Sequence, residues 1–306
     1  MFILDEFSFK SNIRMSNIPP KFHPDYQDEF FLNLDKILVP IGGKKFECTG
    51  LELAFYISHE YGAKLDLLHI GSDPGNEIDG YLKKLHKFEI EYNLVTIKKP
   101  NVPKAIIEYW QEHKHDLVIM SGKRRPTILD KMTIPSISSS VISHINTEVL
   151  QIFPPTMQKI SDKLKNIAVL LPYSKRDPFL IRWASAIAAP QKGARVKVYH
   201  IAQVPDMVPL SGAAQEKVIK KEKNNFKKYI EEYEQIFGQL IKPSFILGHG
   251  VLPALKSIFK KDEPDLVIIG KSKESNFWQK LAKPLSSKIR DKLLNPGVCI
   301  HHMLDE

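Results

Sequence analysis

The sequence is poor in cysteine and lacks any long uninterrupted apolar segment. Its two cysteines, Cys48 and Cys299, are far apart and have no second pair, which excludes a disulfide framework and a cysteine zinc site. No segment reaches the ~18 consecutive apolar residues that a membrane-spanning helix needs, and the acidic Asp5 and Glu6 come too early for a secretion signal. We therefore expect a cytoplasmic protein with no membrane insertion.

Charge of one sign is also not concentrated anywhere in the chain. The 306 residues include 44 Lys and Arg against 35 Asp and Glu, a formal charge of +9, which favours contact with anions such as nucleotides, nucleic acid or acidic lipid headgroups. The densest basic run, 217–228, is mixed with Glu216, Glu222 and hydrophobic residues at helical spacing. A solvated helix face explains this run better than a nucleic-acid patch does, so we expect no nucleic-acid partner.

Motifs typical of catalysis and of metal binding are missing. The serine runs at 136–140 and 286–287 lack a G-x-S-x-G nucleophile elbow, so helix capping is the preferred interpretation. The segment 42–45 lacks the G-x4-G-K-[ST] spacing of a phosphate loop and is interpreted as a turn. His69 and His200 have no carboxylate or cysteine at ligand spacing, which favours a repeated structural role. The sequence therefore predicts neither an enzyme nor a metal site.

An internal repeat is the strongest feature that is present. A length of 306 residues suits two domains of about 150 residues each. YGAKLDLLHI at 61–70 returns 131 positions later as KGARVKVYHI at 192–201, and HDLVIMSGK at 115–123 returns 149 positions later as PDLVIIGKS at 264–272. Because the blocks keep their order, we predict two copies of one unit, with residues gained in the helical stretch 213–237 of the second copy.

Both copies alternate short apolar runs with helical patterns. Apolar strands separated by helices are typical of a parallel sheet that is covered on both faces. The predicted fold class is therefore α/β, with two tandem doubly wound, Rossmann-like domains of five parallel strands each. The predicted strands are 36–41, 64–70, 92–98, 117–121, 148–153, 167–171, 196–201, 244–247, 266–270 and 298–302, and the predicted helices are 50–58, 81–88, 104–112, 138–145, 179–188, 213–237, 253–259 and 281–293.

A proline pair marks the boundary between the copies. Pro154 and Pro155 can continue neither a sheet nor a helix. We predict a first domain at 33–155 and a second at 156–306. Residues 1–32 show no clean period and are predicted to be an N-terminal extension, either an arm docked on a domain or a mobile segment.

A crevice for an anion is expected at the ends of the strands. In doubly wound folds the ligand lies outside the carboxyl ends of the strands, where strand order reverses. The loop after the fourth strand of each copy carries small residues beside Lys or Arg, and such a loop can cradle a phosphate. The candidate ligand-binding residues are Ser121, Gly122, Lys123, Arg124 and Ser136 in the first copy, and Ile201, Gly270, Ser272, Lys273 and Ser286 in the second.

The order of these blocks resembles the universal stress protein family, twice, over about residues 33–304. The resemblance is carried by KILVPI at 36–41, GAKLDLLHI at 62–70 and DLVIMS at 116–121, followed by a serine-bearing helix and an apolar strand. It implies five parallel strands per domain, domains that pair through their last strands, and ATP or a related nucleotide as the ligand. A tandem chain is thus similar to an intramolecular version of the family's dimer, and a homodimer of whole chains stays open.

The nucleotide motif of that family is altered here. Its form is G-x2-G-x9-G-[ST] after the fourth strand, with an aspartate at the end of the first strand facing the adenine. This chain has Arg124 and Lys273 at the second glycine, and Gly42 and Pro172 at the aspartate position. Glycine lets the backbone approach a phosphate closely, whereas Arg and Lys bring a Cβ and a long stem.

Three functions follow from the resemblance. The first is a regulatory or stress-response protein that acts by binding and dimerisation, with a protein partner that the sequence does not identify. The second is a nucleotide hydrolase on the same fold, which would need a base or metal carboxylate near the loop, where Asp130 and Glu274 lie close in sequence. The third is a regulatory module of a membrane transporter.

Overall fold

The computed structural model describes residues 32–42, 48–72, 75–121, 137–153, 164–171, 173, 177–203, 213–237, 240–248, 251–270 and 297–301. The first half contains β1 (Lys36–Ile41), α1 (Cys48–Tyr61), β2 (Lys64–Ile70), the 3-10 helix η3 (Gly75–Ile78), α2 (Asp79–Lys87), β3 (Tyr92–Ile97), α3 (Val102–His113), β4 (Leu117–Ser121), α4 (Ile137–Ile142) and β5 (Glu148–Phe153). The second half contains β6 (Asn166–Leu170), α5 (Asp177–Ala188), β7 (Arg195–Gln203), α6 (Ala213–Phe237), β8 (Ile241–Gly248), α7 (Val251–Asp262), β9 (Leu266–Gly270) and β10 (Gly297–His301).

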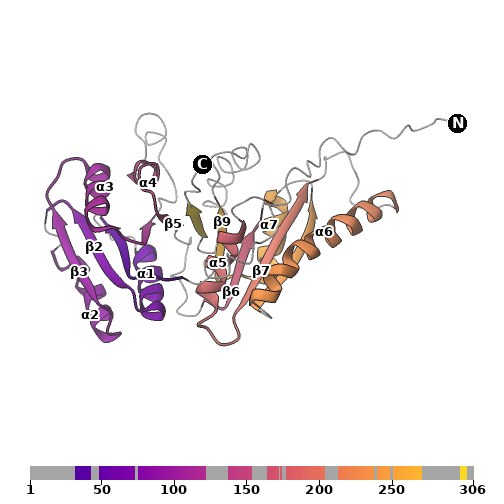
Figure 1. Ribbon diagram of the computed structural model, residues 1–306, viewed down its shortest axis with the longest axis horizontal. Helices are drawn as coiled ribbons and strands as arrows, with labels where there is room; N and C mark the ends of the chain where they lie inside the picture. Colours follow the sequence, from indigo (N-terminus) through magenta and orange to yellow (C-terminus); the bar gives the residue numbers. More distant parts are fainter. Residues whose placement is uncertain are drawn as a thin grey trace.

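The described strands form one ten-stranded sheet in the order β3-β2-β1-β4-β5-β10-β9-β6-β7-β8. Neighbouring strands within each half are parallel, and the two halves meet where β5 and β10 pair antiparallel. Figure 1 shows the two halves on either side of this junction. The α/β class and the two tandem five-stranded units are therefore confirmed, and the two units join edge to edge. The predicted helix 281–293 and the residues around the predicted boundary, 154–163, lie outside the described residues, so the proposed domain boundary stays a prediction.

The strand register relates the two halves residue by residue. Ile37 of β1 pairs with Leu117 of β4, and Ile167 of β6 pairs with Leu266 of β9. The first strands are thus related by 130 positions and the fourth strands by 149 positions. This second offset is the one that the repeated Asp-Leu-Val-Ile block predicts.

The aspartate of that repeated block has a structural task in both halves. One carboxylate oxygen of Asp116 accepts hydrogen bonds from the backbone N–H groups of residues 35 and 36, at 2.8 and 2.9 Å. Asp265 does the same for residues 165 and 166, at 2.9 and 2.8 Å. Each aspartate therefore accepts hydrogen bonds from two successive amides at the start of the first strand of its half.

Local sequence signals explain the bounds of the helices, as α3 illustrates. The side chain of Asn101 accepts a hydrogen bond from the Lys104 amide at 3.1 Å and caps the start, where Pro103 fits the first turn. Lys114 ends the helix in the left-handed conformation, with φ 52°. The helix buries one face against the sheet, formed by Ala105, Ile106, Tyr109 and Trp110.

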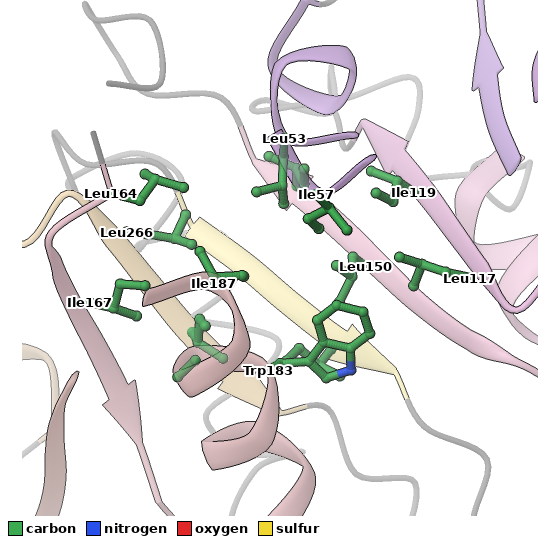
Figure 2. Close-up of a cluster of buried hydrophobic side chains, with 14 of the residues drawn as sticks. Leu53, Ile57, Leu117, Ile119, Leu150, Leu164, Ile167, Trp183, Ile187 and Leu266 are labelled. Atoms are coloured by element: carbon green, nitrogen blue, oxygen red, sulfur yellow. The ribbon is translucent and has the colours of Figure 1, made fainter. Parts of the chain in front are cut away.

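One hydrophobic core continues across the junction between the halves. Leu53 and Ile57 of α1 lie on one side, Trp183 and Ile187 of α5 lie on the other, and Leu150 of β5 lies between them (Figure 2). All five side chains are fully buried. Because apolar burial is the main favourable term in folding, this shared core stabilises the two halves as one unit.

Hydrogen bonds reinforce the same junction. The hydroxyls of Tyr56 and Tyr61 in α1 donate to the backbone carbonyls of Ile187 and Ala186 in α5, each at 2.6 Å. The Trp183 indole N–H donates to a carboxylate oxygen of Glu148 in β5 at 2.9 Å. The contacts between α1 and α5 therefore fix how the halves sit against each other, in addition to the strand pairing.

Candidate functional site

Each half has a point where strand order reverses. β1 lies between β2 and β4, and β6 lies between β7 and β9, so a ligand crevice is expected outside the carboxyl ends of these strands. Ser121 ends β4, Gly270 ends β9 and Ile201 lies near the end of β7, so these predicted site residues lie at the strand ends where a crevice is expected. The other predicted site residues lie outside the described residues; they are Gly122, Lys123, Arg124, Ser136, Ser272, Lys273 and Ser286.

In the first crevice, a glycine of α1 lies directly against the end of β4. A Cβ atom at Gly50 would come within 2.7 Å of the Ser121 hydroxyl oxygen and 3.4 Å of the Ser121 amide nitrogen. Any side chain at position 50 would therefore displace Ser121. The helix and the strand end approach this closely because position 50 has no side chain.

In the second crevice, the small residue belongs to the strand and the large residue belongs to the helix. A Cβ atom at Gly270 would come within 3.1 and 3.2 Å of the two methyl carbons of Leu180 in α5. Leu180 is 1% exposed, so its side chain fills the space above the end of β9. Glycine at 270 therefore has a packing reason that is independent of any ligand.

The repeated histidines contact the backbone in equivalent ways. The Nδ1 atoms of His69 and His200 lie 3.3 and 3.1 Å from the carbonyl oxygens of Ile41, which ends β1, and Leu171, which directly follows β6. His69 Nε2 also lies 2.7 Å from the carbonyl oxygen of Ser72. These contacts agree with the structural role that the sequence favours.

His200 is held neutral by its surroundings. Burial lowers the pKa of His200 to about 4, although the hydrogen bond to Leu171 opposes this shift. The neutral ring therefore donates its Nδ1 hydrogen to the Leu171 carbonyl at neutral pH.

An aromatic cluster that the sequence did not predict surrounds His200. The Tyr173 ring stacks on the imidazole with centroids 3.8 Å apart, and the rings of Phe226 and Phe245 lie 5.7 and 6.0 Å from it. Tyr229 meets Tyr173 edge-on at 5.2 Å. The sequence signal that could have revealed this cluster is the large Tyr173 at the position that matches Gly43 in the repeat.

A buried carboxylate lies beside this cluster. Asp177, in the first turn of α5, is fully buried and accepts a hydrogen bond from the Tyr229 hydroxyl at 3.2 Å. A negative charge at a helix N-terminus is favoured by the helix dipole. Burial, with the charges of Glu222 and Asp177, raises the pKa of Tyr173 above its usual value.

A second buried polar network lies in the first half, away from the carboxyl ends of the strands. Asp66 of β2 accepts hydrogen bonds from Asn93 Nδ2 at 2.9 Å, from the Tyr109 hydroxyl at 3.1 Å and from His115 Nε2 at 2.9 Å. Burial acts to raise the pKa of Asp66, but these hydrogen bonds hold it below its usual value. Burial lowers the pKa of His115, although the hydrogen bond to Asp66 and the charge of Asp66 oppose this shift.

The second half has the opposite charge at the equivalent strand position. Lys197, which matches Asp66, pairs with Asp262 at 2.6 Å, and the Tyr199 hydroxyl donates to Asp262 at 2.5 Å. Both networks link the second strand of a half to the end of the helix that precedes its fourth strand. We interpret them as structural, because the Asp66 and Asp262 carboxylates are bonded by neighbouring side chains, although His115 Nδ1 is buried without a hydrogen-bond partner among the described residues.

Other classes of site receive no support within the part of the chain that the structure describes. There, no group of three or more His, Cys, Asp or Glu side chains could hold a metal ion. None of the helices in the described ranges is both long and apolar enough to cross a membrane. Exposed basic residues gather on α6 at Lys220, Lys221, Lys227 and Lys228, and Glu231 lies at one end of this group.

No protein-family model matches the sequence, and no curated protein matches it significantly. Solved structures do match its fold. A universal stress protein from Archaeoglobus fulgidus DSM 4304 matches with a TM-score of 0.56 and 14% identity, over 90% of this chain and 100% of that chain. A protein of unknown function from Pseudomonas aeruginosa PAO1 matches with a TM-score of 0.55 and 14% identity, over 87% and 92%.

A third match comes from a membrane transport system. The cytoplasmic domain of a prokaryotic cation chloride cotransporter matches with a TM-score of 0.54 and 13% identity, over 88% of this chain and 96% of that domain. All three matches cover both halves of the chain. The fold is therefore that of tandem universal stress proteins, as the sequence blocks predict.

Proposed function

We propose that this chain is a cytoplasmic regulatory protein of the universal stress protein type, which acts by binding rather than by catalysis. The observation that carries the proposal is the match of the whole tandem unit to a universal stress protein over 90% of the chain. The candidate ligand is ATP or a related nucleotide. Its candidate site is the first crevice, where Gly50 and Ser121 bring α1 against the end of β4.

Among the described residues at this strand end, the geometry of His69 favours binding over turnover. A general base needs a lone pair aimed at the substrate. His69 instead directs both ring nitrogens at the backbone, toward the carbonyl oxygens of Ile41 and Ser72. The basic loop residues Lys123 and Arg124, which follow β4 in sequence, would supply charge for a phosphate.

Equilibrium binding of ATP to the full chain, together with identification of any nucleotide released on heating, tests this proposal. We expect saturable binding of ATP and no formation of ADP or AMP from it. An Arg124→Glu variant should bind ATP at least about tenfold more weakly than the native chain. Lys98→Glu, at an exposed lysine just after β3, is the matched control and should bind as the native chain does. Absence of binding at millimolar ATP would refute the nucleotide proposal, and steady ATP turnover would refute the non-catalytic one.

A second candidate function is regulation of a membrane transporter. The match to a transporter's cytoplasmic domain over 88% of this chain favours it. A domain of this kind would bind its transporter at the membrane surface. Chemical crosslinking in membranes of the source organism should then join this chain to a transport protein, and recovery of the chain only in complexes without one would count against this candidate.

A further inference from the structure

The two crevices of this chain differ at matching positions. The strand register relates β1 to β6 by 130 positions, so that Gly50 of α1 matches Leu180 of α5. By the same offset Gly43 matches Tyr173. The second half thus has large side chains at two positions where the sequence of the first half has glycine; of these two glycines the structure describes Gly50, which packs against Ser121.

The side chains of the second half occupy the space that a ligand would need. Leu180 covers the end of β9, because its methyl groups lie 3.1 and 3.2 Å from where a Gly270 Cβ would be. Asp177, one turn earlier in α5, is fully buried and bonded to Tyr229 of α6. Leu180 thus packs over the end of β9, beside β6, where strand order reverses, and Asp177 joins the start of α5 to α6.

Tyr173 closes the remaining part, above the end of β7. Its ring lies on His200 at stacking distance, so the aromatic surface that could receive a flat base is already covered. The Tyr173 hydroxyl is buried and has no hydrogen-bond partner among the described residues, and the backbone at Tyr173 has φ 58°. An unpaired buried hydroxyl on a left-handed residue indicates that the packing of the ring holds this conformation.

We infer that the second crevice is permanently filled by Tyr173, Leu180 and Asp177, so that a nucleotide-type ligand binds only in the first half, one per chain. The identity of the ligand rests on the proposed function, whereas the filled crevice rests on the packing alone. The second half then serves as a built-in partner subunit. It supplies β10 and α5 to the junction, as the other subunit of a dimer would.

Thiol protection tests the filled crevice without any ligand. In a chain with Cys48→Ser and Cys299→Ser, Leu180→Cys should react with a thiol reagent about 1,000-fold or more slowly than Ala189→Cys, an exposed site just after the same helix. Phe226→Cys, a buried position of α6 in the same cluster, replaces Leu180→Cys if that variant fails to fold. A reaction rate of the cysteine at position 180 within about tenfold of the rate at the exposed position 189 would overturn the inference.

Binding of ATP to the native full chain completes the test. One ATP per chain, with a photoreactive ATP analogue attached to first-half peptides, is the expected result. Two ATP per chain, or label on peptides that contain Tyr173, Leu180 or Gly270, would overturn the inference. No binding, with position 180 protected, would refute the proposed ligand and leave the filled crevice supported.

Discussion

Acid should destabilise the second half through His200, and the size of the effect follows from its burial. The pKa of His200 is about 4 in the folded protein, against about 6.5 for an exposed histidine. Because the folded-state pKa is lowered, the unfolded chain binds the proton more readily. The stability contributed by the buried neutral His200 is therefore fully present above the pKa of the unfolded state, about 6.5. It is lost as the pH falls from this value toward the folded-state pKa of about 4.

Replacement of His200 by asparagine should remove this loss. Linkage between the two pKa values gives about 2 kcal/mol less stability at pH 5 than at pH 7.5, rising to about 3 kcal/mol at pH 4. His200→Asn keeps a side-chain N–H donor for the Leu171 carbonyl but has no proton to gain. The variant should start less stable because the stack with Tyr173 is lost, and should then lose about 2 kcal/mol less than the native chain on acidification.

Urea unfolding at pH 7.5, 6 and 5 measures this difference, with near-ultraviolet circular dichroism as the probe. Val198→Ala, at a fully buried position of β7, is the control, because it weakens the same strand without removing a titrating group. Its stability should fall with pH as that of the native chain does. If His200→Asn and the native chain lose the same free energy of unfolding between pH 7.5 and pH 5, the account of a buried neutral histidine is wrong.

Three further predictions concern packing and the buried networks. Trp183→Ala at the junction should cost about 3–5 kcal/mol in urea unfolding, and a loss below 1 kcal/mol would show that the shared core contributes little. Gly270→Ala should destabilise by about 1–3 kcal/mol because its Cβ meets Leu180, and addition of Leu180→Ala should make the cost of Gly270→Ala disappear; additive losses would contradict that contact. Asp66→Ala should cost about 3–5 kcal/mol because it leaves His115 buried without its partner, and a wild-type melting temperature would refute this.

The sequence predicted the fold well because its strongest signals are local and repeated. Short apolar runs between helical patterns predicted strands such as 117–121 and 266–270, which the structure has as β4 and β9. The repeat also placed Asp116 and Asp265 at matching positions, although their task of binding strand-start amides was visible only in the structure.

Burial was harder to predict than strand identity. The segment 92–97 forms β3 at one edge of the ten-stranded sheet, where Leu94 is 38% exposed. Apolar composition alone does not tell an edge strand from a central one. In the same way, Asp66 stands within the apolar run LDLL, and its partners come from segments 27 to 49 residues away.

The strand ends at which the candidate site was placed are confirmed, whereas the site itself stays a prediction. Strand order alone gives the place of a crevice in a doubly wound fold, and Ser121 and Gly270 do lie at the ends of β4 and β9. The difference between the two crevices depends on which side chain of α1 or α5 meets which strand end. That pairing is a tertiary contact and became apparent only in three dimensions. In the first half a glycine of the helix, Gly50, meets Ser121 of the strand, whereas in the second half Leu180 of the helix meets a glycine of the strand, Gly270.

The central claim, that the two halves are joined edge to edge within one chain, can be tested by a single crosslink. Cys299 of β10 lies opposite Gln151 of β5 in the antiparallel register, and directly opposed residues lie within the Cα distance range of disulfides, about 4.4–6.8 Å. In a Cys48→Ser background, oxidation of Gln151→Cys should give an intramolecular 151–299 disulfide in mass-spectrometric peptide maps. Ile152→Cys, which faces Val298 and the opposite side of the sheet, should give none. No intramolecular disulfide from Gln151→Cys, or equal crosslinking from both positions, would contradict the joined sheet.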